Sequence, residues 1–149
     1  MKKNLARAVV CSLICVCMFA SNAYATSDMV TLDIDDNTAS LDFVGDCYGG
    51  NTDGSVIKIS GNNDKNINLK GESADWENIG CFLYPLYDVG ILNQSSGRTM
   101  ISSDKFLAIL SGSTQKDYKA ISNQAGKLIF NNDVVVDCVI ENKKDAVLE

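Results

Sequence analysis

The stretch KLIFNNDVVVDCVIE, residues 127–141, is the clearest indication of the fold class. Two runs rich in β-branched side chains flank the turn-forming triplet NND, a pattern typical of two strands joined by a tight turn. Val134, Val136, Cys138 and Ile140 alternate with other residues, so they are expected to share one face of a single strand, with the Cys138 thiol buried in the core. The stretch therefore predicts a β-hairpin.

Two further stretches have the same organisation. VTLDI and ASLDFVG surround DDNT within residues 30–45, and SVIKIS and NINLK surround GNNDK within residues 55–70. Three hairpins predict a mainly β protein, a single antiparallel β-sandwich or small barrel domain. The alternative is an α+β fold with one or two short helices on an antiparallel sheet. Residues 73–79 fit one short helix, while residues 103–122 fit either a helix or buried strands.

The N-terminus has the organisation of a secretory signal peptide. A cationic segment, residues 1–7, precedes an apolar run over residues 8–20 that is too short to span a bilayer comfortably. Ala23 and Ala25 match the small-x-small cleavage pattern, which predicts a cut between Ala25 and Thr26. The alternative is an uncleaved N-terminal anchor. We expect a signal peptide over 1–25 and a single acidic β-rich domain over 26–149, located in the periplasm or outside the cell.

Charge and composition exclude several classes of ligand and of catalytic site. The formal net charge of the whole chain is −6, and it becomes −9 without the three cations of residues 1–25. An acidic surface disfavours nucleic acid and anionic lipid and suits a basic protein or surface ligand, or cations such as Ca²⁺. Simple solubility is the favoured interpretation of the same charge. The chain contains no histidine, which excludes Ser-His-Asp and Cys-His catalysis as well as imidazole-dependent zinc sites. We assign no catalytic residue, no cofactor, and no membrane span after cleavage.

Three cysteines follow the predicted cleavage site: Cys47, Cys81 and Cys138. An odd number in an oxidising compartment predicts one disulfide and one remaining thiol, or an intermolecular bridge. Cys47 and Cys81 both lie beside glycines in expected loops, and they are the preferred pair. Cys138 is the alternative partner for either of them.

Asp33, Asp35, Asp36 and Asn37 place several oxygen ligands close together, as calcium sites do. The EF-hand pattern fails, because Thr38 occupies the position that requires glycine and Val44 the position of the bidentate acid. We expect an ordinary polar turn here and predict no metal site.

Aromatic residues gather around Cys81 and the single proline. Trp76, Phe82, Tyr84 and Tyr87 are the predicted binding residues, and core packing is the alternative interpretation of the same side chains. The predicted function is a secreted or periplasmic non-enzymatic binding domain, such as an inhibitor, an adhesin-type protein or an accessory protein. The alternatives are a small histidine-independent hydrolase that uses carboxylates, and a structural surface-fibre subunit.

Overall fold

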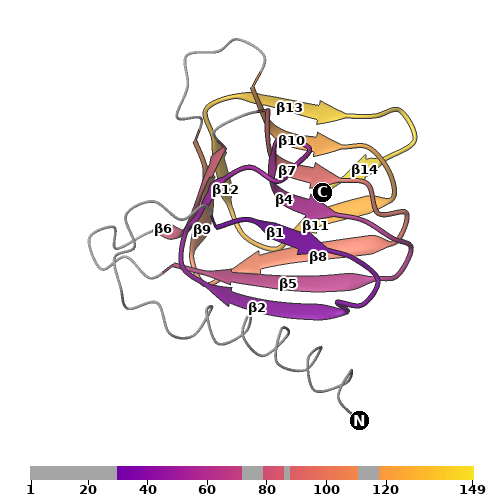
Figure 1. Cartoon of the computed structure of the whole chain (residues 1–149), viewed down its shortest axis with the longest axis horizontal. Coiled ribbons are helices and arrows are strands. Elements are labelled where there is room, and N and C mark those ends of the chain that lie inside the picture. Colours follow the sequence, from indigo (N-terminus) through magenta and orange to yellow (C-terminus); the bar gives the residue numbers. More distant parts are fainter. Residues whose placement is uncertain (1–29, 72–78, 86–87, 111–117) are drawn as a thin grey trace.

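The computed structural model describes residues 30–71, 79–85, 88–110 and 118–149, which form three parallel β-sheets (Figure 1). Sheet 1 contains, in spatial order, β1 (Leu32–Ile34), β4 (Ser55–Ile59), β7 (Val89–Asn93), β10 (Lys119–Asn123) and β13 (Val139–Asn142). Sheet 2 contains β14 (Val147–Leu148), β11 (Lys127–Phe130), β8 (Arg98–Ser103), β5 (Lys65–Lys70) and β2 (Ser40–Val44). Sheet 3 contains β12 (Val134–Val136), β9 (Phe106–Ile109), β6 (Ile79–Pro85) and β3 (Cys47–Gly49).

The chain visits the three sheets in turn, so that each circuit forms one coil of a parallel β-solenoid. Every pairing between named strands joins a strand to its equivalent one coil earlier or later, as in β1 with β4 and β4 with β7. Figure 1 shows β1, β4, β7, β10 and β13 stacked in this order, with β13 at one end. Each coil covers the inward side chains of its neighbours, which builds one continuous core.

The mainly β prediction is confirmed, whereas the antiparallel sandwich or barrel is wrong. The strands on either side of each predicted hairpin turn belong to different sheets: β1 and β2, β4 and β5, β11 and β12. The alternation of side chains marks a strand and its buried face, but it does not specify the partner strand. Here each turn is a corner between sheets, and the backbone hydrogen bonds go to the next coil.

The α+β alternative is also wrong for the residues described, which contain no helix. The helix expected over residues 73–79 is tested at its last residue alone, because residues 72–78 are outside the described part of the chain. That residue, Ile79, begins β6. The ambiguous segment 103–122 contributes strand β9 and most of β10.

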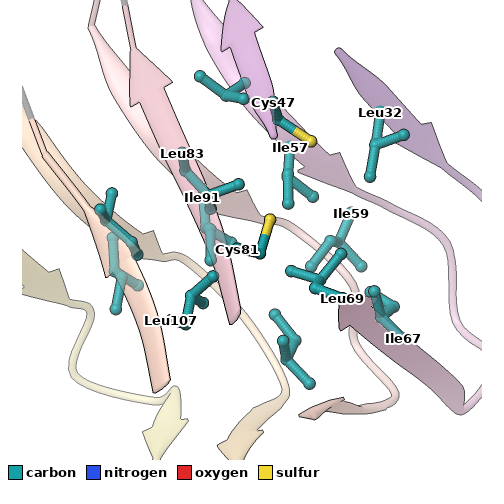
Figure 2. Packing of buried hydrophobic residues seen from close by; sticks show 14 of the residues in the cluster. Leu32, Cys47, Ile57, Ile59, Ile67, Leu69, Cys81, Leu83, Ile91 and Leu107 are labelled. Atoms are coloured by element: carbon teal, nitrogen blue, oxygen red, sulfur yellow. The ribbon is translucent and has the colours of Figure 1, made fainter. Parts of the chain in front are cut away.

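The core consists of columns of apolar side chains that run along the solenoid. One column stacks Leu32, Ile57, Ile91, Ile121 and Ile140 through the register of sheet 1. Figure 2 shows the first three of these side chains together with others from sheets 2 and 3 in the same interior. Successive members are 25, 34, 30 and 19 residues apart, so the coils have no fixed period that the sequence could display.

A polar column occupies the corner that follows sheet 1. The Nδ2 group of Asn93 donates to Oδ1 of Asn123 at 2.8 Å, and Nδ2 of Asn123 donates to Oδ1 of Asn142 at 2.7 Å. Asn93 and Asn123 are completely buried. Gly126 follows in the next turn with φ +56°, and a Cβ there would collide with the carbonyl oxygen of Ser95. The coils therefore stack closely at this corner, and the amides satisfy one another where water is excluded.

Cys138 does not lie inside a single strand, as the sequence predicted. The run from Val134 to Asn142 forms two strands, β12 and β13, in two different sheets, with Asp137 and Cys138 at the corner between them. The Cys138 side chain packs against the core but is only partly buried. The predicted direction of this side chain is thus right, whereas its strand and its full burial are wrong.

Candidate binding surface

The outer face of sheet 3 carries a group of aromatic side chains. Along β3 and β6 the buried residues Cys47 and Leu83 are paired in register, and so are their neighbours Tyr48 and Tyr84. Because side chains alternate along a strand, Tyr48 and Tyr84 point outward, as does Phe82. The rings of Phe82 and Tyr84 are stacked, with centroids 5.3 Å apart and planes 13° from parallel. We call Tyr48, Phe82 and Tyr84 the aromatic face.

Exposure varies strongly along this side of sheet 3. Phe82 is only 5% exposed and its register partner Ala108 is also buried, although both lie at outward positions. Tyr48 is 45% exposed, and Val135 at the other end of the sheet is similarly exposed. The middle of the face is therefore buried, and Tyr48 is the aromatic side chain that a binding partner can reach most readily.

Asp46 adds a negative charge beside the aromatic face. Its carboxylate accepts a hydrogen bond from the backbone N–H of Phe82 at 2.9 Å, which ties the corner before β3 to β6. Partial burial raises the pKa of Tyr84, and the nearby charge of Asp46 raises it further. The Tyr84 phenol thus stays neutral and can donate a hydrogen bond over the physiological pH range. The arrangement suits recognition through ring contact and a few polar bonds.

The structure brings two of the four predicted binding residues together. Phe82 and Tyr84 form the stacked pair, while Trp76 and Tyr87 lie outside the described residues. Sequence reasoning missed Tyr48, which is 36 residues away from its partner Tyr84. The only indication of Tyr48 in the local sequence was its position on the exposed side of the alternating segment around Cys47. The pairing of Tyr48 with Tyr84 depends on how the coils stack.

The acidic turn between β1 and β2 uses its side chains to hold the corner. Asp35 accepts hydrogen bonds from the backbone N–H and the side-chain amide of Asn37, both at 2.8 Å. Asp36 accepts the backbone N–H groups of Asn62 and Asn63 and the Nζ of Lys65, whose side chain is buried. These bonds, first that from Asn63 and then that from Lys65, lower the pKa of Asp36.

Asp33, the remaining acid of this turn, lies opposite Lys58 in the register of sheet 1. In the described part of the chain, no three acidic or cysteine side chains gather as metal ligands. Of these acids, Asp36 holds the neighbouring coil, whereas the hydrogen bonds of Asp35 stay within its own turn.

The predicted disulfide between Cys47 and Cys81 is absent, and all three cysteines of the described chain are free thiols. The two residues are nevertheless neighbours in the core, where Figure 2 shows both sulfur atoms among the inward side chains. Cys47 is paired with Leu83, which places Cys81 two residues earlier in β6, on the diagonal and not opposite. With neighbouring strands about 4.8 Å apart and a rise of about 3.3 Å per residue, such diagonal Cα positions lie about 8 Å apart, beyond the usual Cα separation in a disulfide. The Cys81 thiol and burial raise the pKa of Cys47 well above its ordinary value.

Comparisons of the chain with known proteins identify no relative. No family model, no curated protein and no solved structure matches it. Within the residues that the structure describes, no helix is long and apolar enough to cross a membrane.

Proposed function

We propose that this chain is an exported, non-enzymatic binding domain that contacts a protein or surface ligand through the aromatic face. The observation that carries the proposal is the half-exposed Tyr48 beside the partly buried Tyr84, on a sheet whose outward residues Phe82 and Ala108 are buried. Tyrosine is enriched at binding surfaces because it offers a large rigid ring and a polar tip. The N-terminal signal pattern supports export to the periplasm or beyond the cell.

The acidic composition supports a basic partner. Asp46 lies directly before β3 and next to the aromatic face, so a cationic side chain could approach the Tyr48 ring and this carboxylate together. Complementary charge mainly accelerates association and selects among partners, whereas buried rings contribute most of the affinity. An inhibitor, an adhesin-type protein and an accessory protein are all consistent with this mode of recognition.

The hydrolase alternative has less support from the carboxyl groups. A glycosidase mechanism requires one acid whose pKa is raised so that it can donate a proton. Hydrogen bonds and neighbouring cations instead lower the pKa of Asp36, Asp53 and Glu141. Asp53 and Glu141 also form ion pairs, with Lys58 and Lys119 respectively. These acids are suited to holding neighbouring residues together.

A site-specific cross-linking experiment tests the binding proposal. A photoreactive phenylalanine analogue at position 48 should capture a discrete partner in cells that express the protein. The matched control carries the same analogue at Asn66, an exposed position on β5 in sheet 2. Cross-links at position 48 that disappear with Asp46→Lys but persist with Lys70→Glu would support a basic partner. Identical cross-linking patterns at positions 48 and 66 would contradict the proposal.

A further inference from the structure

The two ends of the solenoid differ in how well they are covered. Leu32 and Ile34 in the first coil are only 3% and 2% exposed. The free edge of β3 is also occupied at one point, because Val30 and Tyr48 exchange two backbone hydrogen bonds. Ile140 occupies the same column as Leu32 but is 46% exposed, since β13 at the other end pairs only with β10 among the described strands. Among the described residues, the last coil thus presents an uncovered apolar surface at this end of the solenoid.

The asparagine column indicates that this open end can accept another layer. Asn93 and Asn123 each donate two hydrogen bonds through Nδ2, one to the next asparagine and one to a carbonyl of the next turn. The last member, Asn142, donates one to the carbonyl of Ala146 in its own turn, and no second bond from it is found among the described residues. Asn142 is exposed, so the column ends at the surface, where a further layer would add an acceptor for its second N–H.

We propose that the C-terminal end binds the same end of a second copy of this chain, related by a two-fold axis. The axis passes through Ile140, so β13 pairs antiparallel with β13 of the second copy. The same rotation brings β12 of one copy to β14 of the other, because it exchanges sheets 2 and 3. All three free edges of the last coil are then paired, and the isologous contact closes at two subunits.

The register of the proposed pairing follows from side-chain direction and charge. A shift by one residue would bring inward side chains against outward ones, so only every second register is allowed. If the two-fold axis passed through Val139, Glu141 of one copy would lie opposite Asp137 of the other. If the axis passed through Glu141, this residue would lie opposite Glu141 of the other copy. Like charges directly opposite each other are destabilising. Centring on Ile140 instead brings Asp137 of each copy, just before β13, towards Lys143 of the other, just after β13, so opposite charges meet on both sides of the axis.

Head-to-tail stacking is disfavoured by the same reasoning. Continuing the parallel register of sheet 1 would place Glu141 of one copy opposite Asp33 of the next. In addition, the inward side chains of the first coil are already buried. The last coil, residues 134–149, is smaller than a standard interface of about 20–30 residues a side, so we expect a dissociation constant on the order of micromolar.

Sedimentation equilibrium of the purified protein, from about 1 to 500 μM, tests the proposal. We expect a monomer–dimer equilibrium that Lys143→Asp weakens at least tenfold. The double variant Asp137→Lys/Lys143→Asp should restore dimerisation, because the exchanged charges meet again across the axis. Lys70→Asp makes the same charge change at an exposed position on β5, away from this end, and should leave the equilibrium unchanged. Circular dichroism verifies that each variant is folded.

Cross-linking tests the axis itself. In a Cys138→Ser background, Ile140→Cys places two thiols opposite each other, within reach of a disulfide. One molecule of oxidised glutathione would accept the two electrons, giving one intermolecular disulfide and two molecules of reduced glutathione. Val139→Cys, whose thiols lie on a diagonal, should cross-link much more slowly. A monomer at all concentrations, growth beyond a dimer, failure of the double charge exchange to rescue, or equal cross-linking at both positions would overturn the proposal.

Discussion

Removing the central amide of the asparagine column should destabilise the solenoid far more than removing an exposed amide. Asn123 is completely buried and makes three hydrogen bonds: it accepts from Asn93 and donates to Asn142 and to the carbonyl of Val147, at 2.7 to 2.9 Å. Each such bond contributes roughly 0.5–1.5 kcal/mol net, so Asn123→Ala should lower the free energy of unfolding by about 3 kcal/mol. Asn93 keeps its bond to Ala125, which limits the loss at its end.

Urea denaturation followed by far-UV circular dichroism measures this effect. With a dependence of about 1–3 kcal/mol per molar urea, the midpoint should fall by roughly 1–3 M. Asn68→Ala is the matched control, because this partly exposed residue makes one hydrogen bond, to Asp42, at the surface. Its cost should stay within about 0.5 kcal/mol. If Asn123→Ala costs no more than Asn68→Ala, the buried column does not stabilise the stack and the reasoning is wrong.

Three further measurements concern Asp36, Cys138 and the predicted cleavage site. The pKa of Asp36 is lowered in the folded chain, so the contribution of this carboxylate to stability is present at neutral pH and is lost as pH falls through the acidic range. Asp36→Asn should therefore lower the melting temperature at pH 7 and flatten the decline of the melting temperature between about pH 5 and pH 3. Burial, followed by Asp137, raises the pKa of Cys138 to about 11; in native protein this thiol should alkylate before Cys47 and Cys81, and its rate should rise about tenfold per pH unit from pH 8 to 10, whereas equal rates for all three would contradict their burial. Mass spectrometry of exported protein should find Thr26 at the N-terminus, and a product retaining Met1 would contradict the predicted cleavage.

The limits of sequence reasoning are clearest at the predicted hairpins. The alternation in SVIKIS and NINLK correctly located β4 and β5, in which the structure buries Ile57, Ile59, Ile67 and Leu69. The turn GNNDK was also found. A corner of a solenoid and a hairpin turn nevertheless have the same composition, because both need polar residues that leave the extended conformation. The choice of partner strand could not be predicted from this local pattern.

The candidate binding surface was predicted in part for a related reason. Phe82 and Tyr84 were grouped because they are close in sequence, and their common face follows from β6, a strand that the sequence pattern did not predict. Tyr48 joins them only through the pairing of β3 with β6. Likewise, the proximity of Cys47 and Cys81 was predicted. Their diagonal register, which leaves them as two thiols and not a disulfide, depends on how two coils align.

By itself the sequence determined that this chain is mainly β, located the strands and corner turns of the three predicted hairpins, and placed Val134, Val136 and Cys138 on the side that packs against the core. These properties follow from β-branched composition and two-residue periodicity, and both are local. Only the tertiary structure decided that the strands pair in parallel, coil upon coil. Coils of unequal length conceal the repeat in the sequence. A strand presents the same hydrogen-bonding edges to any partner strand, so these edges do not select the partner. The arrangement is fixed by stacking columns of isoleucine, leucine and asparagine from distant parts of the chain.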